Sequence, residues 1–184
     1  MARRKTGNSI EQYAFLAIRI ETYSADISAR INHKARDKRY RDDDVCIYDY
    51  GSRFEIEGVC TYPNERAGDK YHITVYGRQP GERDLEATLS DYAVRDEEGA
   101  RKYRKVRGQY IPVYQDPYGL GLLQKERGGK TWHGWLSIPE QIATQMLTLL
   151  TTVRPLYMDI HERKFGRTRW INGFGLQTTD PAED

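Results

Sequence analysis

The chain has 184 residues, of which 38% are hydrophobic and 30% are charged. This length is typical of one domain, and the 14 tyrosines and three tryptophans add large surfaces that a core can bury. Because 29 Lys and Arg nearly balance 27 Asp and Glu, the formal charge is only +2, which argues against a strongly cationic, histone-like nucleic-acid binder.

The composition also indicates a cytoplasmic protein. Its two cysteines, Cys46 and Cys60, form no C-x-x-C motif, so we expect reduced thiols and neither a disulfide framework nor a zinc site. The basic start of the chain lacks a signal-peptide cleavage site, and no apolar run approaches the ~18 residues of a membrane span. We therefore expect a cytoplasmic location and no membrane partner.

The N-terminal part of the chain predicts a tail, a strand and a connection. Residues 1–9 are polar and basic and are expected to form a flexible tail. Over residues 13–20, apolar and polar residues alternate, which predicts a half-buried strand. Residues 23–33 fit a strand and a helix, and both alternatives remain open. The charged stretch 34–44 is typical of a solvated connection.

The next segment holds three strand candidates, of which the last two are expected to pair as a hairpin. They are residues 45–50, 54–62 and 71–77. Residues 85–94 fit a helix about as well as a strand. Pro112 lies within the strand candidate 110–114 and predicts that this strand is at a sheet edge, because proline donates no backbone hydrogen bond.

In the following segment, two glycines predict a turn, and the spacing of the apolar residues changes from that of a strand to that of a helix. Gly128 and Gly129 separate two apolar runs, residues 120–127 and 131–138, and predict a hairpin. Beyond it, one apolar stripe predicts an amphipathic helix over about residues 139–153. The stripe consists of Ile142, Met146, Leu149, Leu150 and Val153.

The sequence also marks both ends of this helix and the elements that follow it. Ser137 and Glu140 have the spacing of a capping box, and Pro155 predicts the end of the helix. Two more strands are expected around residues 156–163 and 170–176.

These elements predict an α+β fold. Seven or more strands with short connections favour a single domain over residues 10–177, with a mostly antiparallel sheet on which the one helix packs. Residues 178–184 are acidic and contain proline, and they are expected to form a flexible C-terminal tail.

Asp159 and His161 are the candidate catalytic residues. They lie two apart on one face of a predicted strand, where a carboxylate can orient an imidazole that acts as a base. Arg163 continues this row, and Arg169 on the last strand is expected on the same face, whereas Glu162 must point the other way. A solvated sheet face of mixed charge is the alternative interpretation.

Three basic clusters carry the candidate binding residues. Lys and Arg neutralise phosphates and Tyr offers a stacking face, which is the combination found in single-strand binding grooves. Acidic triplets at 42–44 and 96–98 adjoin the first two clusters, so pairing within the chain is an alternative. The candidate residues are Arg36, Lys38, Arg39, Tyr40, Arg101, Lys102, Tyr103, Arg104, Lys105, Arg163, Arg167 and Arg169.

Trp132 and Trp135 fall on opposite faces of one predicted strand, with His133 between them. One tryptophan is therefore expected in the core and the other at least partly exposed. An exposed tryptophan beside a histidine could stack on a base or a sugar ring.

Function is less determined than fold. Nucleotide-binding, nucleophile-elbow and zinc-protease motifs are absent, so we expect no cofactor and no metal, and whether the chain is an enzyme stays open. We favour a non-enzymatic binding or assembly module that engages nucleic acid or a protein partner through basic loops and an aromatic-rich sheet face, alone, as an oligomer or as a subunit of a complex. The alternatives are a small phosphodiester-cleaving enzyme that uses Asp159 and His161, and a small-ligand-binding β-sandwich or barrel.

Overall fold

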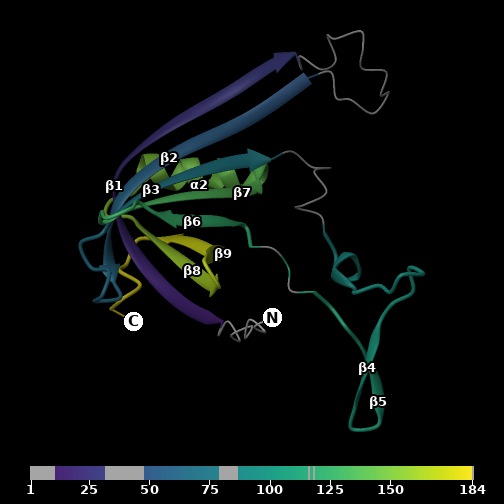
Figure 1. Ribbon diagram of the computed structural model, residues 1–184. Helices are drawn as coiled ribbons and strands as arrows, with labels where there is room; N and C mark the ends of the chain where they lie inside the picture. The colour runs from purple at the N-terminus through teal and green to yellow at the C-terminus, as the bar shows by residue number, and fades with distance from the viewer. Residues whose placement is uncertain (1–10, 32–47, 79–86, 116, 118, 184) are drawn as a thin grey trace. The chain divides into compact units, whose positions relative to one another are not determined.

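The computed structural model describes residues 11–31, 48–78, 87–115, 117 and 119–183 (Figure 1). The tail predicted at 1–9 and the connection predicted at 34–44 lie outside these residues. Contacts divide the chain into two compact units, the first formed by Met1–Gln79 with Gly119–Asp184 and the second by Pro80–Tyr118.

Seven strands of the first unit close into a barrel in the order β1, β2, β3, β7, β6, β9, β8. Neighbouring strands are antiparallel except β3 and β7, which run parallel. The predicted α+β fold with a mostly antiparallel sheet is confirmed, and the sheet is closed. The strands are β1 (Gln12–Ile31), β2 (Tyr48–Tyr62), β3 (Lys70–Arg78), β6 (Gly121–Lys125), β7 (Thr131–Pro139), β8 (Tyr157–Phe165) and β9 (Thr168–Gln177).

Alternating side chains of the strands fill the barrel. On β1, Leu16, Ile18 and Ile20 are buried, and on β8, Met158 and Ile160 are buried as well. This period of two is what the sequence showed, since successive side chains of a strand point to opposite faces. The hairpins predicted for β2 with β3 and for β6 with β7 are present, and β8 pairs with β9 in a third hairpin.

β1 and β2 are longer than the sequence indicated. Residues 23–31, which fitted a strand and a helix, belong to β1, and Gly51 and Ser52 lie within β2 instead of separating two strands. β2 pairs with β3 only from Ser52 onward, so residues 48–51 pair with β1 alone. The two strands therefore extend past the rest of the sheet as an arm (Figure 1).

The predicted helix is present as α2 (Glu140–Thr152), which contacts β2, β3 and β7. It buries Ala143, Met146 and Leu150, whereas Ile142, the first residue of the expected stripe, is 41% exposed. The helix approaches the sheet closely at Gly77, where a Cβ would lie 3.0 Å from the Cβ of Ala143.

The capping box expected at the start of α2 is not formed. Pro139 is the N-cap residue and makes no side-chain cap. The carboxylate of Glu140 instead accepts a hydrogen bond from the Ser52 hydroxyl, at 3.0 Å, and so ties the first turn of the helix to β2. The prediction was wrong because a tertiary partner occupies the side chain that the local motif requires.

The second unit contains a short 3-10 helix η1 (Leu89–Tyr92) and a two-stranded sheet of β4 (Tyr103–Val106) and β5 (Gln109–Pro112). Of the segment 85–94, the described residues form this single turn, neither of the elements that the sequence suggested. Pro112 ends β5, which agrees with the predicted edge position.

Candidate functional site

Asp159 and His161 lie together on the outward face of β8. The Asp159 Oδ2 and His161 Nε2 atoms are 3.6 Å apart, and the His161 side chain is 61% exposed. The ring of Phe15 on β1 meets the imidazole edge to face at 5.3 Å. Arg163, two residues further along the strand, forms an ion pair with Glu11. The pair therefore joins an exposed imidazole to a carboxylate whose side chain is only 16% exposed, and the neighbouring arginine is engaged by another carboxylate.

Arg169 is not on this face, so its predicted placement was wrong. A register shift follows His161, after which Glu162 is opposite Ile171 and Lys164 is opposite Arg169. Directly opposed residues of a sheet share a face, so Arg169 points inward as Glu162 does. Arg167 is exposed in the turn between β8 and β9 and joins neither group.

Glu162, Arg66 and Arg169 form an ionic cluster inside the barrel. Two nitrogens of Arg66, from the loop between β2 and β3, donate to the two oxygens of Glu162 at 2.8 and 3.0 Å. Arg169 of β9 donates to the same carboxylate, whose side chain is 2% exposed. Burial acts to lower the pKa of Arg66, but hydrogen bonds to Glu162 and Tyr71 raise it above its ordinary value. The Arg66 guanidinium thus stays charged.

Trp132 is the aromatic centre of this cluster. Its indole N–H donates to Asp69 Oδ2 at 2.9 Å, and its ring stacks on Tyr71 with centroids 5.8 Å apart. The Arg66 guanidinium lies 4.5 Å from the ring centroid, and the charged groups of Arg169 and Lys125 each lie at 5.2 Å. As expected for opposite faces, Trp132 is buried and Trp135 is 41% exposed.

The ionic cluster and the hydrogen bond between Trp132 and Asp69 link separate parts of the barrel to one another. Together they join β7, β8 and β9 to the loop before β3. Sequence reasoning noticed Glu162 only as the residue that points away from Asp159. The signal that could have found it is its position two residues after buried Ile160, which places a carboxylate in the core and therefore requires cationic partners.

The buried thiol of Cys60 is expected to make the barrel less stable at alkaline pH. Burial raises the pKa of its thiol from 9.0 to about 11, a shift that the nearby positive charge of Arg66 only partly opposes. The thiol of the unfolded chain releases its proton near pH 9, and that of the folded chain near pH 11. The contribution of the protonated thiol to the free energy of unfolding is therefore complete below pH 9 and is lost as the pH rises through 11.

We expect this loss to approach roughly 2 kcal/mol, and a Cys60→Ala variant to lack it. Urea unfolding at a series of pH values measures the difference between the two proteins. Parallel stability curves from pH 9 to 11 would show that the thiol does not titrate differently on folding.

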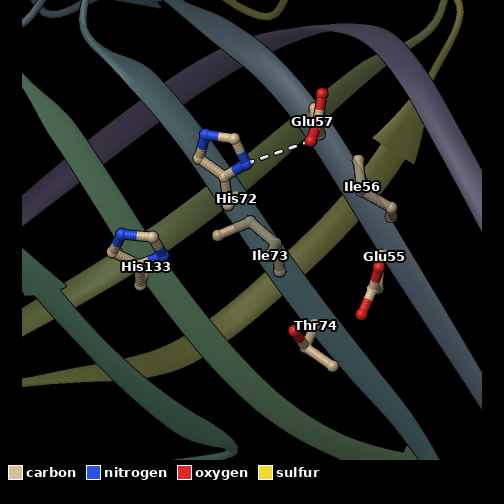
Figure 2. A pocket seen from close by; sticks show the side chains of 7 residues that line it. All are labelled: Glu55, Ile56, Glu57, His72, Ile73, Thr74 and His133. Carbon is tan, nitrogen blue, oxygen red and sulfur yellow. Dashed lines mark ion pairs between the residues drawn. The ribbon is translucent and has the colours of Figure 1, made fainter.

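A shallow hollow lies on the outer face of β2, β3 and β7 (Figure 2). His72 Nδ1 is 3.2 Å from an oxygen of Glu57, and the rings of His72 and His133 stack at 5.5 Å. Among the residues that the structure describes, no three or more His, Cys, Asp or Glu side chains are grouped so as to hold a metal ion. The hollow is thus an exposed polar surface lined by imidazoles and carboxylates.

Residues 101–112 of the second unit form a two-stranded basic element that we name the finger. β4 and β5 pair antiparallel, and Arg107 and Gly108 at its tip both have positive φ angles, 49° and 86°, as a type I′ turn requires. Every residue from 101 to 111 is exposed. Five of the predicted binding residues are here, namely Arg101, Lys102, Tyr103, Arg104 and Lys105. The finger cations are Arg101, Lys102, Arg104, Lys105 and Arg107.

The finger contains no acidic residue, and within the described ranges none of its five cations has a carboxylate at salt-bridge distance. The neighbouring acidic triplet at 96–98 does not pair with it. The Asp96 carboxylate accepts hydrogen bonds from the backbone of Glu98 and Ala100 and so closes its own turn. The alternative that the triplet neutralises this basic run is not realised in the described part of the chain.

The base of the finger is held by a third segment of backbone. Val94 donates to the Val113 carbonyl at 2.9 Å and accepts from Lys102 at 2.8 Å. Arg95 also forms an isolated bridge with Arg101. These bonds fix where the finger starts and leave residues 103–111 projecting from that base.

The other predicted basic cluster, Arg36, Lys38, Arg39 and Tyr40, lies outside the described residues.

In the described part of the chain, no helix has the length and apolar character needed to cross a membrane. Comparison with protein families, with curated proteins and with solved structures finds no match for this chain.

Proposed function

We propose that this protein is a non-enzymatic nucleic-acid-binding module and that the finger is its contact element. The observation that carries this proposal is the set of five exposed cations on one short ribbon, with no acidic residue and no internal ion pair among the described residues. Cations of this kind gain affinity for a polyanion by releasing the counterions that its phosphates condense. A near-neutral total charge is compatible with this because the positive charge is local.

Aromatic side chains on the finger also support the proposal. Tyr110 is 72% exposed and Tyr103 is 55% exposed. Lys105 Nζ lies 5.8 Å from the centroid of the Tyr110 ring, so a cation and a stacking surface stand side by side. Alternating phosphate-binding cations and exposed aromatic rings favour a nucleic acid over an acidic protein surface, which offers carboxylates but no bases.

A triple variant, Arg104→Gln with Lys105→Gln and Arg107→Gln, tests the proposal. We expect its affinity for a fluorescein-labelled DNA duplex to fall by at least about tenfold, because three phosphate contacts are lost. The slope of the logarithm of affinity against the logarithm of salt concentration should decrease by about two to three. Fluorescence anisotropy over a salt series measures both quantities.

The matched control removes the same charge from exposed positions of the first unit, by Lys70→Gln with Arg127→Gln and Lys130→Gln. We expect it to bind nearly as the unchanged protein does. If the unchanged protein shows no salt-sensitive binding to duplex DNA, duplex RNA or single-stranded DNA, or if both triple variants lose affinity equally, the proposal is wrong.

A further inference from the structure

The geometry of the finger points to one class of nucleic acid. We propose that it binds double-stranded B-form DNA by entering the major groove. This inference rests on the proposed function and adds to it the form of the nucleic acid and the groove that the protein reads.

The first argument is that the finger carries cations on both of its faces. The pair Lys105 with Tyr110 is on one face, and the next pair, Arg104 with Ile111, is on the other. Arg107 lies at the turn between the strands. A ribbon inside a groove has phosphates on either side of it, so cations on both faces can reach a phosphate. On a flat platform for a single strand, one of these two sets would face away from the ligand.

The second argument is that no described residue of the second unit covers either face of the finger. In sheets that present single-stranded nucleic acid on one face, the opposite face packs on the core of the domain. Here all side chains from 103 to 111 are exposed, including Val106 at 37% and Ile111 at 38%. A groove can surround both faces of such a ribbon, and these two apolar side chains can contact the methyl groups of thymine, which lie in the major groove.

The third argument is size. Paired strands lie about 4.8 Å apart, so a ribbon with its side chains fits a major groove about 12 Å wide and not a B-form minor groove about 6 Å wide. The four residue pairs of β4 and β5 extend roughly 10 Å, close to the major-groove depth of about 8.5 Å. The major groove of A-form RNA is too narrow and too deep for side chains to read.

The test compares three probes of one sequence on the full chain: duplex DNA, duplex RNA and the single DNA strand. We expect duplex DNA to bind at least about tenfold more tightly than either of the others. Dimethyl sulfate footprinting then locates the contact, because it methylates guanine N7 in the major groove and adenine N3 in the minor groove. We expect protection at guanine N7 alone, and its loss in the finger triple variant but not in the control triple variant.

The two proposals can fail separately. Binding to none of the three probes overturns the proposed function and this inference with it. Tighter or equal binding of the single strand, or protection of adenine N3, overturns the inference and leaves nucleic-acid binding by the finger in place. Circular dichroism and urea unfolding of both triple variants show that any loss of protection comes from a folded protein.

Discussion

Replacing Trp132 by alanine is expected to lower the free energy of unfolding by about 3–5 kcal/mol, the usual cost of removing a large buried aromatic side chain. Trp132 is 3% exposed and stacks on Tyr71, so the substitution leaves a cavity in the barrel. It also removes the donor to the Asp69 carboxylate, a group that is itself only 5% exposed. Urea unfolding followed by far-ultraviolet circular dichroism measures the loss.

Trp135→Ala is the matched control for this experiment. Trp135 is on the same strand, but it points outward and is 41% exposed. We expect its replacement to cost less than about 1 kcal/mol. Equal losses in the two variants would show that the ionic cluster around Trp132 adds nothing beyond general strand packing.

Glu162→Gln is the second large effect. The substitution keeps the shape of the side chain and removes its charge, so Arg66 and Arg169 lose their common anion inside the barrel. Breaking a fully buried ion pair costs about 3–5 kcal/mol. Because the side chains of Arg66 and Arg169 are 14% and 24% exposed, we expect the free energy of unfolding to fall by about 2–4 kcal/mol. The same unfolding experiment measures it.

Its control is Glu21→Gln. Glu21 also pairs with an arginine, Arg19, at 3.6 Å, but both side chains are about half exposed. Exposed pairs of this kind contribute at most about 1 kcal/mol. If Glu162→Gln and Glu21→Gln destabilise the protein equally, the two-arginine contact with Glu162 is not a significant source of stability.

The local elements of this protein follow from its sequence. The alternation over residues 13–20 predicted the first part of β1, Gly128 and Gly129 predicted the turn between β6 and β7, and an apolar stripe predicted α2. These patterns were sufficient because a strand or helix exposed on one side must repeat its apolar residues with its own period. The opposite faces of Trp132 and Trp135 follow from the same rule.

The candidate site was only partly predictable. The basic composition of residues 101–105 identified the region that became the finger. That these cations project on an uncovered two-stranded ribbon, while Asp96 closes its own turn, depends on contacts that composition does not encode. The prediction that Arg169 of β9 shares a face with Asp159 and His161 was wrong, because a single register shift after His161 decides which face each later residue takes.

The sequence by itself therefore determined α2, most of the barrel strands with their buried faces, and the basic segment. Only the tertiary structure decided that the sheet closes, because closure requires β1 to pair with β8 and β3 to pair in parallel with β7, and a period of two says nothing about the partner strand. It also decided the role of Glu162, whose carboxylate is tolerable in the core only because the loop between β2 and β3 and the neighbouring strand β9 each bring an arginine to it.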